Sequence, residues 1–172
     1  PSLRRPGSTY HGSEWARRID RETKVIYPLG GIELLWSLCM APLLFRTRLL
    51  AALGNALFGR RESLRARAAG IAHLAVACHW ARRMRAAPEP VSHIHSQWIH
   101  SCGTVAMYLA WLLDRPFSFT GHATDLFRDR CALLDKIERA DFIVCISEFH
   151  RDFYLRHGAR PEQCVIAYCG ID

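Results

Sequence analysis

The spacing of apolar residues differs between two parts of the chain. Residues 32–86 are rich in Leu, Ala and Arg, and between Ile71 and Ala81 apolar positions recur every three or four residues. This spacing is typical of amphipathic helices. We therefore expect two or three helices in this part. The possible breaks between them are Gly54, Gly59 and Gly70.

After Pro88-Glu89-Pro90 short apolar runs alternate with helical patterns. The expected strands are 91–95, 116–120, 141–146 and 164–168. The expected helices are 101–113, with Ser101 as its N-cap, 131–139 and 147–156. This alternating order predicts an α/β fold with a Rossmann-like parallel sheet and flanking helices. We expect residues 1–90 to form the helical part of one domain and residues 91–172 its βα core. A further β-prone run lies at 24–27.

The most apolar run extends from Leu29 to Phe45 and contains Glu33 and Pro42. A helix that spans a bilayer needs about 20 consecutive apolar residues, so this run is a poor candidate for one. It predicts a buried helix. The alternative is a helix that lies in a membrane interface, a position that Trp36 would suit.

Half of the residues are hydrophobic, which excludes a disordered chain. The net charge of +7 is concentrated in residues 46–85, which hold nine Arg and one acidic residue. Nucleic-acid-binding surfaces usually combine basic residues with glycines and aromatic platforms, whereas these arginines alternate with Leu and Ala. We therefore expect no nucleic-acid partner. The segment predicts either a solvated helix face or a basic surface that meets anionic lipid or a polyanionic substrate.

Several kinds of chemistry lack support in the sequence. The seven cysteines include no C-x-x-C pair, which argues against a disulfide framework and a zinc ribbon. His93, His95, His100 and His122 could converge on a metal, but no nearby carboxylate or cysteine completes a usual ligand spacing, so we expect none. The chain also contains no nucleophile elbow, dinucleotide fingerprint or P-loop.

Ligands of parallel α/β sheets bind at the carboxyl ends of the strands. In this chain those ends carry polar or small residues: His95, Gly121-His122, Ser147 and Gly170. Ser147 is placed to cap a helix, where free N–H groups also favour an anionic ligand. For His122 two interpretations stay open, a site residue and a hydrogen-bonded structural histidine.

The motifs HIHSQW, RPFSFTGHATDLF, DFIVCISEF and VIAYCGID follow one another in residues 91–172. In this order they resemble the N-terminal domain of family 4 glycosyltransferases, closest to the bacterial exopolysaccharide and colanic-acid type. The resemblance implies the GT-B architecture, in which two Rossmann-like domains enclose a cleft. It also implies that transfer retains the anomeric configuration and needs neither a metal nor a cofactor beyond the nucleotide-sugar co-substrate.

By the same resemblance, His122 is the catalytic residue and His95, Asp125, Ser147 and Gly170 bind substrate. The implied function is transfer of a sugar to a growing surface polysaccharide or a lipid-linked acceptor. The expected location is cytoplasmic, and the basic helical segment predicts peripheral contact with an anionic membrane. We also expect the donor-binding C-terminal domain to be absent from this chain, which would make it an inactive piece of a longer enzyme. The alternative is a non-catalytic α/β module that binds a phosphorylated ligand or a protein partner.

Overall fold

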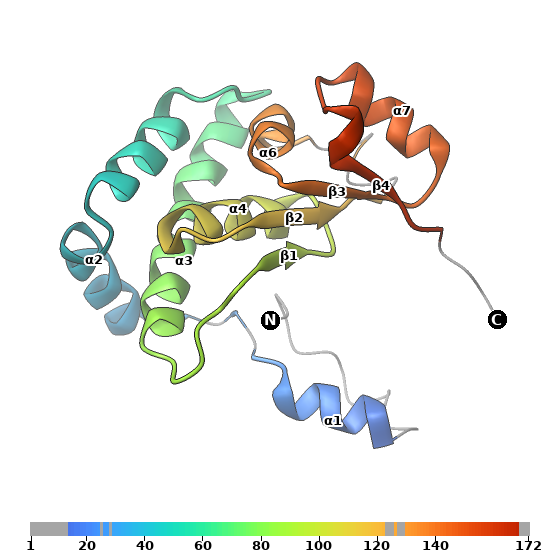
Figure 1. Ribbon diagram of the computed structural model, residues 1–172. Coiled ribbons are helices and arrows are strands. Elements are labelled where there is room, and N and C mark those ends of the chain that lie inside the picture. The colour runs from blue at the N-terminus through green and yellow to red at the C-terminus, as the bar shows by residue number, and fades with distance from the viewer. Residues whose placement is uncertain (1–13, 25, 28, 123–125, 127–129, 169–172) are drawn as a thin grey trace.

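The computed structural model describes residues 14–24, 26–27, 29–122, 126 and 130–168 and confirms the α/β fold. Its four strands form one parallel sheet in sequential order (Figure 1). The strands are β1 (Ile94–Ser96), β2 (Phe117–Thr120), β3 (Phe142–Cys145) and β4 (Cys164–Ile166). The helices between successive strands are α4 (Ser101–Leu113), α6 (Leu133–Arg139) and α7 (Glu148–Arg156), the last followed by the 3-10 turn Pro161–Gln163. This is a Rossmann-like arrangement.

The pairing register gives the sheet two different faces. Ile94 pairs with Phe117 and Ser96 with Phe119, and the three apolar residues of these pairs belong to the buried core. Because side chains alternate along a strand, His95 lies on the opposite face, where it pairs with Ser118. The sheet therefore carries an apolar face toward the core and a polar histidine and hydroxyl cluster on the other side.

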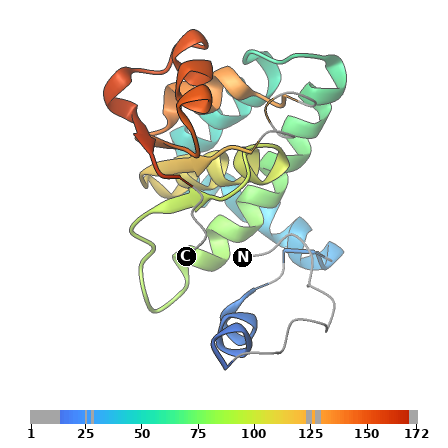
Figure 2. The same ribbon diagram turned by 90° about the vertical axis from the view of Figure 1, so that its right-hand side faces the viewer.

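The helical part forms two further layers. α2 (Gly31–Phe58) packs on α3 (Leu64–Arg85), and α3 packs on α4, so that α2 is the outermost layer on this side (Figure 1). The break between α2 and α3 falls at Gly59, as expected, whereas Gly54 and Gly70 lie inside helices. α1 (Glu14–Glu22) lies apart from the sheet in both views (Figures 1 and 2).

Three local expectations are corrected. In the β-prone run at 24–27, the described residues form no strand, and Ile26 packs into the hydrophobic core from a loop. β1 begins at Ile94 rather than at residue 91. The N-cap of α4 is His100, because Ser101 already has helical geometry. The expected cap of α7 by Ser147 is confirmed.

The expectation of a buried helix at Leu29–Phe45 is wrong. The run belongs to α2, which continues to Phe58. In an apolar 18-residue stretch of this helix, only 17% of the residues are buried. The helix kinks at Arg46, whose φ of 46° and ψ of −121° are not helical. By length and composition, α2 is the one helix in the described part of the chain that could cross a membrane.

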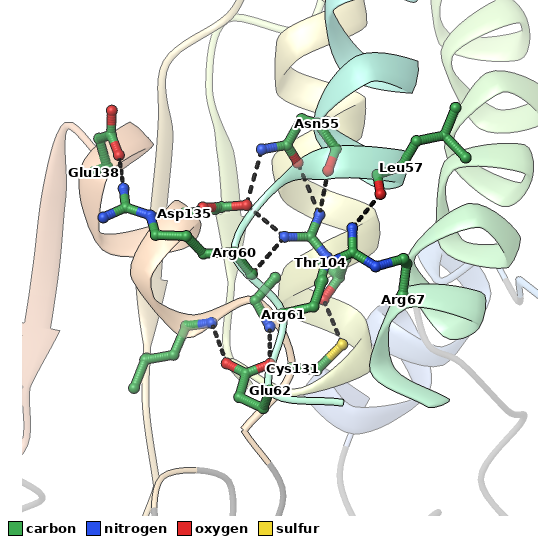
Figure 3. A network of polar contacts seen from close by, with 12 residues as sticks. Asn55, Leu57, Arg60, Arg61, Glu62, Arg67, Thr104, Cys131, Asp135 and Glu138 are labelled. Carbon is green, nitrogen blue, oxygen red and sulfur yellow. Dashed lines mark hydrogen bonds and ion pairs between the residues drawn. The ribbon is translucent and has the colours of Figure 1, made fainter. Parts of the chain in front are cut away.

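A buried polar network joins the helical part to the βα core (Figure 3). Arg61, in the α2–α3 loop, donates to Asp135 of α6, to Tyr108 Oη of α4 at 2.8 Å and to Asn55 Oδ1 of α2 at 2.8 Å. The Glu62 carboxylate accepts from the backbone N–H groups of Ala132 and Leu133 at the start of α6. Arg61 thus lies in the interior, so a solvated helix face does not describe all of the basic segment.

Candidate functional site

His122 follows β2 at the carboxyl edge of the sheet, where the rule for parallel α/β folds places a ligand site. Its ring packs on the indole of Trp98, with 4.4 Å between the ring centroids and an interplanar angle of 41°. Its Nε2 lies 3.4 Å from Nε2 of Gln97. Gln97 and Trp98 belong to the loop after β1. The ends of two adjacent strands therefore bring three polar or aromatic side chains together.

Gly121 is required here by packing rather than by turn geometry. A Cβ atom at this position would overlap the hydroxyl of Tyr154, a fully buried residue of α7. The backbone of Gly121 is not in the left-handed region, so close packing and not a strained turn explains the glycine. The glycine lets α7 approach the carboxyl edge directly beside His122.

His95 lies within β1 and is held by hydroxyl groups of β2. Its Nδ1 is 2.7 Å from Ser118 Oγ, and its Nε2 is 3.1 Å from Thr120 Oγ1. Partial burial, together with the nearby His93, lowers the pKa of His95. His95 is therefore a neutral hydrogen-bonding group at neutral pH. Thr120 is the last residue of β2, two positions before His122.

Ser147 caps α7, which begins just after β3 and therefore lies at the same edge of the sheet as His122. The Ser147 Oγ accepts from the backbone N–H of His150 at 3.3 Å and lies 2.8 Å from Nδ1 of the same residue. Burial lowers the pKa of His150, and electrostatic repulsion from His122 adds to this effect. Ligand binding by Ser147 stays a prediction. Asp125 and Gly170 lie outside the described residues.

The sequence interpretation missed Lys136, which positions the loop that carries Gln97 and Trp98. Lys136 is 1% exposed, and its Nζ donates to the carbonyl oxygens of Ile99 and, at 2.8 Å, His100. Lysines are mostly exposed, so no local signal pointed to this role. Trp98 was missed as well. The signal for it was an aromatic residue directly after a polar strand end.

The four histidines considered as metal ligands do not converge. His93 and His95 both contact Ser118 Oγ, His122 packs on Trp98, and His100 Nδ1 lies 2.8 Å from Ser101 Oγ. Among the described residues, no group of three His, Cys, Asp or Glu side chains is placed to hold a metal ion. Metal independence itself stays a prediction.

A groove of about 970 Å³ runs along β1 next to the site. Its lining includes the side chains of His95, Gln97 and Trp98. Apolar residues of α4, among them Val105 and Leu109, line it as well. The carboxyl edge thus combines hydrogen-bonding side chains with an adjoining open concave surface, as small-molecule sites do.

The parallel sheet and the helices that flank it define a Rossmann-like α/β domain. The model of one protein family, Glycosyltransferase Family 4, matches residues 45–172, which is well over half of the chain. The chain therefore belongs to glycosyltransferase family 4. The match begins at residue 45, so it adds the second half of α2 and all of α3 to the region that the motifs had covered. No curated protein and no solved structure matches the chain.

Proposed function

We propose that this chain forms the acceptor side of a transferase that moves a sugar from a nucleotide-sugar donor to a growing surface polysaccharide or a lipid-linked acceptor. The observation that carries this proposal is the placement of His122 against Trp98 and Gln97, at the edge where a ligand of this fold binds. Family membership supports the transferase activity. The acceptor, the retained configuration and the independence from metals and cofactors belong to the proposal.

In the proposed reaction, an oxygen of the acceptor hydroxyl forms a bond to the anomeric carbon on the face that the diphosphate leaves. The bond between that carbon and the diphosphate oxygen breaks, and the hydroxyl proton passes to the departing phosphate. His122 contacts the reacting sugar, and its packing on Trp98 limits the orientations of its ring. Such preorganisation of polar groups supplies a large part of enzymatic rate enhancement.

The first turn of α7 is placed to support the leaving group. Free N–H groups at a helix N-terminus favour anions, and this one begins at Ser147, beside His150. α7 follows β3, and β3 pairs with β2, so the N-terminus of α7 and His122 lie at the same edge of the sheet. The proposed diphosphate position therefore shares the carboxyl edge with the proposed catalytic histidine.

The test is sugar transfer by the natural protein that carries this domain, measured with a panel of nucleotide sugars. We expect His122→Ala to lower kcat by about 100-fold or more, the usual cost of removing a polar group that acts in the transition state. His157→Ala, at the far end of α7, is the matched control and should stay within a few-fold of the wild type. Equal activities of the two variants would refute the role of His122. Product NMR reports the anomeric configuration, and activity in EDTA reports metal independence.

A further inference from the structure

α2 turns its large apolar side chains away from the protein. Its outer face is defined here by Ile32, Leu35, Trp36, Leu43, Leu50 and Phe58, which are between 56% and 88% exposed. In Figure 1 this helix is the outermost layer, on the side of α3 that faces away from the sheet. Single exposed apolar residues are common on soluble monomers, but this many large ones on one helix are unusual.

The inward side of α2 shows the reverse pattern. Its buried residues are mostly small, namely Ser37, Ala41, Ala52 and Ala56, together with Phe45. A helix of a water-soluble protein buries its large apolar residues and exposes polar ones, whereas small residues at the contact and large ones outside are typical of helices packed within a bilayer. The distribution of side-chain size therefore indicates an apolar medium on the outer side.

The charges of α2 decide between spanning a bilayer and lying in its surface. As one straight helix its 28 residues would reach about 42 Å, more than the roughly 30 Å of a hydrocarbon core, although the kink at Arg46 divides them into two shorter segments. However, Arg46 and Arg48 lie near its middle, and Arg48 pairs with Asp114 of the core at 2.6 Å. A spanning orientation would draw these charges to the bilayer centre at high cost. An orientation in the membrane plane keeps them at the headgroups.

The basic residues beside the outer face favour an anionic partner. Arg46 and Arg48 of α2 are exposed, and Arg46 makes no hydrogen bond or ion pair within the described part of the chain. A second copy joined by this face would offer no free carboxylate to Arg46, because the one acidic residue of α2, Glu33, pairs with Arg83. An anionic lipid surface offers apolar chains and negative headgroups together.

We propose that the outer face of α2 lies in the surface of an anionic bilayer, with its leucines and Trp36 below the headgroups and Arg46 among the lipid phosphates. The inference does not depend on the transferase activity, because vesicle binding is measured without any sugar substrate.

The first experiment is flotation of the 172-residue chain with phosphatidylcholine vesicles, with and without 30% phosphatidylglycerol. We expect binding to the anionic vesicles that weakens with salt, and a loss of about tenfold or more in Leu35→Glu/Leu43→Glu. Val165→Glu, at an exposed apolar position of β4, is the matched control and should bind as the wild type does. Arg46→Gln should weaken binding, while Arg156→Gln on α7 should not.

The second experiment uses a variant that preserves the apolar surface. Lipids brominated in the acyl chains should quench the fluorescence of the wild type, and much of this quenching should be lost in Trp36→Phe. The proposal is overturned if no vesicle binds, if Leu35→Glu/Leu43→Glu binds as the wild type does while keeping its helical circular dichroism, or if Trp36→Phe is quenched equally. A lipid-free dimer that these two glutamates dissociate, without vesicle binding, would assign the face to a second copy. If the double variant does not fold, the quenching comparison decides.

Discussion

Asp135→Asn should destabilise the protein by about 3–5 kcal/mol, the usual cost of leaving one member of a buried ion pair without its partner. The side chains of Arg61 and Asp135 are 0% and 6% exposed. Asp135 also accepts from Asn55 Nδ2 at 2.8 Å, so its charge is the centre of the network in Figure 3. Arg60 contributes little to this loss of stability, because its side chain is 60% exposed and its Nε lies 3.5 Å from Asp135.

The assay is urea unfolding followed by circular dichroism at pH 7. Asp114→Asn is the matched control, because it removes the same charge from a pair with Arg48 whose side chains are 45% and 70% exposed. Asn also tolerates the left-handed backbone of Asp114, so this control should cost no more than about 1 kcal/mol. Equal losses of unfolding free energy in the two variants would refute the reasoning.

A double-mutant cycle measures the interaction free energy between Arg61 and Asp135 apart from their contacts with other residues. Arg61→Met/Asp135→Asn should be more stable than Asp135→Asn alone, because it removes the uncompensated buried charge. Tyr108 and Asn55 keep a hydrogen bond to each other at 3.0 Å in this variant. We expect a coupling free energy of about 1–3 kcal/mol between the two positions. Additive losses would contradict the pairing.

Three further predictions concern single positions. Burial lowers the pKa of His73 from 6.5 to about 4, so the unfolded chain binds a proton there between these pH values and the native protein does not. Stability should therefore fall by up to about 3 kcal/mol from pH 7 to pH 4, and His73→Asn should flatten this part of the pH profile of unfolding. Gly121→Ala should cost about 1–3 kcal/mol in urea unfolding, because the methyl group meets Tyr154, and it should displace His122 and lower transfer activity. Arg46→Gly should raise the unfolding free energy by about 1 kcal/mol, because φ is 46° at this position and glycine adopts such a backbone without strain. An unfolding free energy below that of the wild type would show that the conformation is unstrained.

Much of the candidate site followed from local signals. His122 and His95 were found because parallel sheets bind ligands at the carboxyl ends of their strands, and the short apolar run Phe142–Cys145 marks one such strand plainly. Ser147 was found as a cap because a serine before a helix has a specific local partner, the His150 N–H. Lys136 had no comparable signal, since its role depends on two carbonyl groups about 36 residues away.

The sequence by itself determined the alternation of strands and helices, the position of His122 after a strand and the Ser147 cap, because each depends on residues within a few positions of one another. Only the tertiary structure decided which charged and apolar residues face the interior. Arg61 is buried because α2, α4 and α6 meet around it, although it lies in a segment whose composition suggested a solvated face. The leucines of α2 are exposed because small residues occupy its contacts with the other helices. Burial is a property of packing between distant segments, and a periodic pattern along one helix cannot show what lies beside it.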